Sequence, residues 1–127
     1  MKKLILWITL SSLAFGKITI ITSNNSSLKP ITKQELADLY LGKISKIQGI
    51  EVTPIDNIEN YKEFYIKITG KTPKEIRAYW MRELYKGDRT PPKKMSTKKI
   101  KALIKKNHNV ISYAKHPLTG KLIYTLK

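Results

Sequence analysis

The sequence of 127 residues contains no cysteine. Disulfide bonds, thiol catalysis and thiolate metal sites are therefore excluded. The only imidazole side chains are those of His108 and His116, which flank a predicted strand over 110–114 with no carboxylate close by in the sequence. A zinc site needs three or four ligands of this kind, so we expect no metal site.

The sequence also lacks the short motifs that mark common enzymes. It has no nucleophile elbow, no glycine-rich phosphate loop and no pair of carboxylates in an apolar setting. Local structure accounts for most of the carboxylates: Glu35 and Glu75 fit helix caps, while Glu63 and Glu83 fit exposed helix faces. We therefore predict a non-enzymatic protein without a cofactor.

Acidic residues are scarce, because 9 Asp and Glu stand against 25 Lys and Arg, a net charge of +16. Such a charge attracts phosphate, nucleic acid, anionic lipid and acidic proteins, but the charge alone does not indicate which of these partners is preferred. A lysine-rich, solvated surface is an equally simple interpretation for any single lysine.

The amino terminus has the order of residues found in a cleavable signal peptide. Lys2 and Lys3 precede an apolar run to Phe15, with small residues at Ala14 and Gly16. The run is too short for a membrane-spanning helix, which needs about 20 apolar residues. We predict a signal peptide over 1–16 and one domain over 17–127 that works outside the cytoplasm, with no transmembrane segment after cleavage. The two n-region lysines leave with the signal, so the mature charge is +14.

The first half of the mature sequence alternates strands and helices. A β-branched run predicts a strand over 17–23, covered on both faces and close to the centre of a sheet. Thr32 and Glu35 form a capping box that starts a helix ending at Gly42. A second strand is expected over 50–55, where Pro54 indicates an edge position or the end of the strand, before a turn at 56–57.

The second half is expected to add helices before two closing strands. A helix over 60–68 carries an aromatic stripe, which we interpret as core. The capping box of Thr72 and Glu75 starts a helix that ends at 87–88. Its expected buried residues are Ile76, Tyr79, Trp80 and Leu84. A loop over 89–94 should lead to a basic amphipathic helix that begins near Ser96 or Thr97.

Two strands, over 110–114 and 122–126, should form an antiparallel pair across a turn at 117–120. The order of elements predicts an α/β fold, a small mixed β-sheet with helices on both faces.

Two strand-to-helix loops are candidate anion sites, since the amino end of a helix presents free N–H groups and positive charge. Ser23 and Asn24 follow the first strand, and Asp56 and Asn57 follow the second. Plain turns are the favoured interpretation of both loops. Asp56 would repel a fully ionised anion, but not one that donates a proton to it.

Several motifs resemble those of phosphate-binding proteins of ABC transporters. Residues 30–43, PITKQELADLYLGK, are similar to a Leu-Ser-x-x-Glu-Leu helix that ends in Ile-Phe-Leu-Gly-Lys in that family. Further motifs follow in the same order: RAYW at 77–80, LYKG at 84–87, PP at 91–92 and NVISY at 109–113. The last corresponds to a Gly-x-Ile-Gly-Tyr strand, with Asn109 and Ser112 in place of the glycines.

The resemblance covers the mature chain and is strongest to short, single-lobe members. It implies one lobe of a type 2 periplasmic binding protein, whose full-length relatives bind phosphate between two lobes. In their Arg-x-Asp-Gly-Ser-Gly-Thr phosphate loop, only the aspartate has a counterpart here, Asp56. The resemblance therefore implies a solute-binding-like protein with weak, partner-completed or lost binding of phosphate or another oxyanion. A transporter permease or a periplasmic protein is the implied partner.

An alternative function rests on the basic helix. Its lysines, represented by Lys98, Lys101 and Lys105, would dock on anionic lipid, nucleic acid or an acidic protein. No aromatic residue lies between them to stack on bases, so nucleic acid is the less favoured partner.

Overall fold

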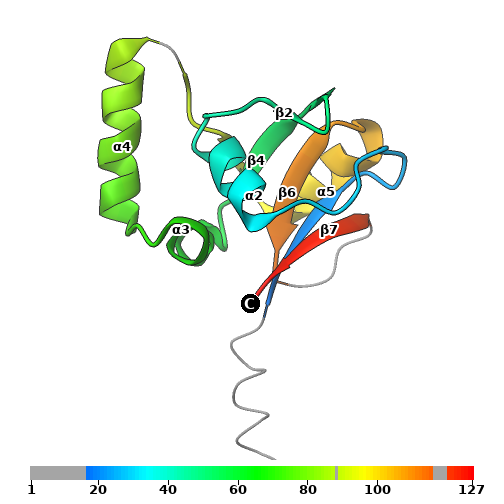
Figure 1. Cartoon of the computed structure of the whole chain (residues 1–127). Helices are drawn as coiled ribbons and strands as arrows, with labels where there is room; N and C mark the ends of the chain where they lie inside the picture. Colours follow the sequence, from blue (N-terminus) through cyan, green and yellow to red (C-terminus); the bar gives the residue numbers. More distant parts are fainter. Residues whose placement is uncertain (1–16, 88, 116–119) are drawn as a thin grey trace, which may run out of the picture.

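The computed structural model describes residues 17–87, 89–115 and 120–127, which form a five-stranded mixed sheet with helices on both faces (Figure 1). The predicted signal peptide over 1–16 and most of the turn at 117–120 lie outside the described residues. The elements in chain order are β1 (Ile18–Thr22), α2 (Lys33–Tyr40), β2 (Lys46–Ile47), β3 (Ile50–Glu51), β4 (Thr53–Asn57), α3 (Tyr61–Thr69), α4 (Pro73–Lys86), β5 (Lys93–Met95), α5 (Thr97–Lys106), β6 (Val110–Ala114) and β7 (Lys121–Leu126).

The strand order is β5-β4-β6-β1-β7, and β2 pairs with β3 in a separate small hairpin. β1 lies between β6 and β7 and runs antiparallel to both. The predicted direct pairing of the last two strands is therefore wrong. β1 is buried along most of its length, so its backbone groups on both edges need partners, and placing it between β6 and β7 supplies them.

β4 is an interior strand, parallel to β5 on one side and β6 on the other, so Pro54 marks neither an edge strand nor the end of a strand, the two positions predicted for it. Pro54 is tolerated because it lies near the beginning of β4, where Ile111 of β6 is its partner and pairing with β5 starts one residue later. The predicted turn at 56–57 is also wrong. Asp56 and Asn57 complete β4, because part of the expected loop before α5 forms β5 and extends the ladder alongside them.

Two clusters of buried side chains cover the two faces of the sheet. On one face, Ile100 and Ile104 of α5 pack with Ile21, Ile55 and Val110. On the other face, α2, α3 and part of α4 pack on Ile20, Ile111 and Tyr113. In Figure 1, α2 lies in front of the sheet and α5 behind it. The predicted fold class is confirmed.

Four aromatic rings form the centre of the larger cluster. Phe64 of α3 stacks on Tyr113 of β6 with ring centroids 3.7 Å apart, and Tyr40 meets Phe64 edge-on at 4.7 Å. Tyr65 packs edge-on against Phe64 at 5.3 Å. The prediction that the aromatic stripe of this helix is core is confirmed, and such pairs stabilise a core beyond their buried area.

The predicted helix starts are also confirmed. Thr32 and Glu35 form a complete capping box at α2, and Thr72 and Glu75 form another at α4. Ser96 caps α5, its side chain accepting a hydrogen bond from the backbone N–H of Lys99. Each cap satisfies backbone N–H groups that the first turn of a helix leaves unpaired.

α4 stands at one side of the sheet (Figure 1) and buries Ile76, Trp80 and Glu83. The prediction was wrong for Leu84, which is 48% exposed, and for Glu83, which was expected on an exposed face. Glu83 can be buried because Arg89, which follows the helix, places its guanidinium 3.3 Å from the Glu83 carboxylate. A buried carboxylate needs such a partner.

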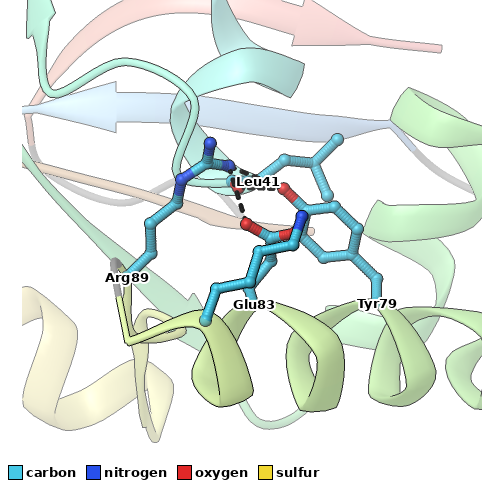
Figure 2. A network of polar contacts seen from close by, with 5 residues as sticks. Leu41, Tyr79, Glu83 and Arg89 are labelled. Carbon is cyan, nitrogen blue, oxygen red and sulfur yellow. Dashed lines mark hydrogen bonds and ion pairs between the residues drawn. The ribbon is translucent and has the colours of Figure 1, made fainter.

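A polar network connects this ion pair to the end of α2 (Figure 2). The Arg89 guanidinium donates a hydrogen bond to the Tyr79 hydroxyl at 3.1 Å, and that hydroxyl donates to the Leu41 carbonyl at 2.6 Å. Beside the network, Gly42 has a φ of 73° and faces Trp80 and Arg89. α4 is therefore held to α2 by polar contacts as well as by packing.

This close approach predicts a difference between two glycine-to-alanine variants. A methyl group at Gly42 would lie 3.0 Å from Cη2 of Trp80 and 3.1 Å from Cδ of Arg89, whereas one at Gly87, which has a similar φ of 79°, meets nothing within 4 Å. Both variants lose about 1 kcal/mol from the left-handed backbone, and Gly42→Ala loses a further ~1–2 kcal/mol from crowding. Urea unfolding measures both losses. Equal losses would contradict the close contact of α4 with the end of α2.

Candidate functional site

The two predicted anion loops lie at opposite ends of the sheet. β4 runs parallel to β6, whereas β1 runs antiparallel to it, so their carboxyl ends point in opposite directions. Asn57 reaches the carbonyl of Tyr113, near the end of β6, while Thr22, just before Ser23, pairs with Ile111 near its beginning. Ser23 and Asn24 therefore cannot share one small ligand with Asp56 and Asn57.

The loop after β1 has the hydrogen bonds of a turn. The side chain of Ser23 is buried and accepts from the N–H of Asn25 at 3.1 Å, and its carbonyl accepts from the N–H of Ser26 at 3.0 Å. Asn24 is exposed. A hollow of about 200 Å³ brings these residues together with Lys105 of α5. Ligand binding at Ser23 and Asn24 stays a prediction.

Asn57 uses its side chain within the fold. Its Nδ2 donates to the Tyr113 carbonyl and to Oγ1 of Thr97, both at 2.9 Å, and its Oδ1 accepts from the N–H of Glu59. These contacts join the end of β4 to β6 and to the start of α5. Asn57 therefore positions its neighbours, and its role as a ligand-binding residue stays a prediction.

Asp56 is a buried carboxyl held by two phenols. Its Oδ1 accepts a hydrogen bond from the Tyr113 hydroxyl at 2.7 Å, and its Oδ2 accepts one from the Tyr65 hydroxyl at 2.9 Å. Burial raises the pKa of Asp56 from 3.8 to about 6, against the opposing effect of the two hydroxyls and of Lys94. Burial also raises the pKa of Tyr65 and Tyr113, so both remain protonated donors.

Asp56 lines a cavity of about 450 Å³ between α3, α4 and the segment that leads into β5. The cavity walls are mostly apolar or aromatic, and two exposed cationic side chains, Arg77 and Lys94, also line it. Lys94 is the β5 partner of Asp56, and its ammonium lies 4.1 Å from the ring centroid of Tyr61. The remaining lining residues are Tyr65, Pro73, Ile76, Trp80, Met81, Leu84, Pro91 and Pro92.

A second cavity, of about 530 Å³, lies beside the first and shares Trp80, Pro91 and Pro92 with it. Arg89 and Lys93 are its charged lining residues, and no carboxyl is among the described residues that line it. We take the Asp56 cavity as the candidate site, because a buried titratable group and two cationic side chains line the same largely apolar pocket.

The sequence predicts Asp56 as a site residue but not the cations beside it. Arg77 lies on α4, and Lys94 lies in a strand paired with Asp56 and not in the predicted loop. The sequence segment that could have placed Lys94 beside Asp56 is Lys93–Met95. This segment pairs as a strand only because β4 extends to Asn57 and provides its partner residues.

The basic helix is placed as predicted. α5 buries Ile100 and Ile104, and Lys98, Lys101 and Lys105 are all exposed. Whether these lysines contact an anionic partner stays a prediction. Within the described residues, no group of three or more His, Asp or Glu side chains could hold a metal ion. No helix in the described part of the chain has the length and hydrophobicity needed to cross a bilayer.

The raised pKa predicts how stability depends on pH. The folded protein binds the Asp56 proton more tightly than the unfolded chain does, so stability rises as the pH falls through about 6 towards 4. Relative to Asp56→Asn, the wild type should gain on the order of 3 kcal/mol between about pH 7 and pH 4. Urea unfolding across this range measures the difference, with the exposed Glu51→Gln as control. If the Asp56→Asn variant gained as much stability on acidification as the wild type, or if the wild type lost stability, the raised pKa of Asp56 would be contradicted.

Comparison with known proteins shows the fold. No protein-family model matches the sequence, and no curated protein matches it significantly. A structure described as a phosphate ABC transporter substrate-binding protein with bound phosphate, from Clostridium perfringens, aligns with a TM-score of 0.54 and 19% identity over 77% of this chain. An ABC-type phosphate transport receptor from Vibrio cholerae aligns with a TM-score of 0.53 and 11% identity over 85% of this chain.

The aligned part is 40% of the first of these proteins and 46% of the second, so this chain spans less than half the length of either. The fold of this chain is therefore shared with a part of each of these two proteins, as the ordered motifs in the sequence imply.

Proposed function

We propose that this chain is an exported, non-enzymatic, solute-binding-like domain that binds phosphate or a related oxyanion weakly beside Asp56. The observation that carries the proposal is the position of Asp56 and Lys94, side by side at the carboxyl ends of parallel strands in a cavity. Ligands of open α/β sheets bind at such ends. The two structural neighbours are described as phosphate-binding or phosphate-transport proteins.

The chemistry of this end of the sheet suits an oxyanion that carries a proton. Lys94 and Arg77 supply positive charge, while the Asp56 carboxylate accepts a hydrogen bond from a protonated oxygen and disfavours a fully ionised anion. The amino end of α3 follows β4, and its cap residue, Asn60, makes no side-chain hydrogen bond there. The N–H groups of the first turn of α3 therefore add favourable electrostatics.

Weak binding follows from the exposure of the two cations. Arg77 and Lys94 are both exposed, and charged groups in contact with water hold an anion less tightly than enclosed ones. A partner that covers the cavity would add donors and exclude water, as the second lobe of a two-lobe protein would. The partner in this proposal is a transporter permease or a periplasmic protein. The signal peptide predicted over 1–16 supports a periplasmic location for the domain.

Calorimetry of residues 17–127 with inorganic phosphate tests this function. We expect a dissociation constant in the millimolar range, which corresponds to about 4 kcal/mol. Lys94→Gln should weaken binding at least tenfold, whereas the matched Lys98→Gln, on the exposed face of α5, should leave it unchanged. A protein that is folded by circular dichroism but gives no heat with either phosphate or a phosphonate at millimolar concentration would contradict the proposal.

A second candidate function is docking through the basic face of α5. Every charged residue of this helix is a lysine, and all five are exposed: Lys98, Lys99, Lys101, Lys105 and Lys106. A face of one charge sign attracts anionic lipid, nucleic acid or an acidic protein.

Charge reversal separates this docking function from a general effect of net charge. Replacing Lys98, Lys101, Lys105 and Lys106 by glutamate should abolish binding to anionic vesicles at low salt. A control with the same charge change replaces four exposed lysines elsewhere: Lys33, Lys43, Lys46 and Lys62. Co-sedimentation with vesicles measures both. Unchanged binding in the first variant, or an equal loss in the control, would refute a specific role for α5.

A further inference from the structure

We propose that the Asp56 cavity binds an oxyanion that carries an apolar or aromatic substituent, such as a phosphate monoester or a phosphonate, in preference to inorganic phosphate. The inference rests on the proposed function, because the charged end of the ligand occupies the same position beside Asp56 and Lys94. The inference adds an organic substituent to this anion, and the apolar lining of the cavity indicates the chemistry of that substituent.

The size of the cavity exceeds what an inorganic anion requires. Its volume is about 450 Å³, within the range of roughly 300–1,000 Å³ that holds organic ligands. A phosphate ion has five heavy atoms and would leave most of this volume to water. An organic substituent on the same anion would fill it.

The walls have the chemistry of an apolar binding surface. Met81 and Leu84 project from α4 into the lining of the cavity, yet they are 72% and 48% exposed. Packing in the core therefore does not explain why these two positions carry large apolar side chains. Trp80 and Tyr65 complete the wall with aromatic surface. An apolar group covering this surface would be stabilised by about 25 cal/mol for each Å² removed from water.

The charged groups are suitably placed to hold the other end of the ligand. None of the ion pairs in residues 17–87, 89–115 and 120–127 includes Arg77 or Lys94, so both cations are free to meet an anion. The charges also disfavour a second copy of this chain as the occupant, since the exposed charged side chains that line the cavity, Arg77 and Lys94, are both cationic and the whole chain carries a net charge of +16. The cavity thus combines a cationic, hydrogen-bonding end with an apolar wall.

Calorimetric titration with phenylphosphonate, inorganic phosphate and benzyl alcohol tests the inference. We expect phenylphosphonate to bind at least tenfold more tightly than inorganic phosphate and benzyl alcohol to give no detectable binding. The double variant Met81→Gln, Leu84→Gln should remove the tenfold advantage of phenylphosphonate over phosphate. Tyr85→Gln is the matched control, because this side chain lies on the same helix, is 95% exposed and does not line the cavity.

The outcomes separate the inference from the proposed function. Equal affinity for the two anions overturns the inference and leaves the function standing. A tenfold advantage that the double variant keeps, or that Tyr85→Gln removes, also overturns the inference, since the apolar contact then lies elsewhere. Benzyl alcohol binding as tightly as phenylphosphonate would show that the oxyanion is not recognised. If phenylphosphonate binds and phosphate does not, the inference is supported and phosphate is excluded as the ligand. No binding of either anion to the folded protein contradicts both.

Discussion

Two phenol hydroxyls from different elements meet on one buried carboxyl, and much of this structure is arranged around that contact. Tyr65 brings α3 to Asp56, and Tyr113 does the same for β6. The rings of these tyrosines pack with Phe64 and Tyr40 in the centre of the larger core. The contact therefore combines a polar requirement with apolar packing, because a buried carboxyl without donors would cost several kcal/mol.

The same contact connects the fold to the proposed function. Burial gives Asp56 a raised pKa, so this carboxyl can exchange a proton near neutral pH, and the cavity gives a ligand access to it. α4 forms the opposite wall and is held to the rest of the molecule through Trp80 and the network of Glu83, Arg89 and Tyr79. The position of α4 therefore determines the width of the cavity, although none of these polar groups binds the ligand in our proposal.

Features encoded within a few residues were predictable from the sequence. The capping boxes of α2 and α4, the amphipathic α5 and the aromatic core stripe of α3 all depend on neighbours three or four positions apart. Features that depend on distant partners were not. Nothing near Glu83 in the helix pattern shows that Arg89 folds back on it, and the pairing of Asp56 with Lys94 requires β5, whose three residues carry too little pattern to predict. The candidate site was thus predicted at Asp56 and missed at Arg77, Lys94 and the wall of α4.

Asp56 is buried at the edge of a cavity, and the proposed oxyanion site depends on the ionisation of this carboxyl. It can be followed by a carbon-13 NMR titration of the Asp56 carboxyl, with and without saturating phenylphosphonate. We expect a pKa of about 6 in the free protein and a higher pKa in the complex, because an anion beside the carboxyl disfavours its ionisation. An ordinary pKa near 3.8 that the ligand leaves unchanged would show that no anion binds beside a buried, titrating Asp56.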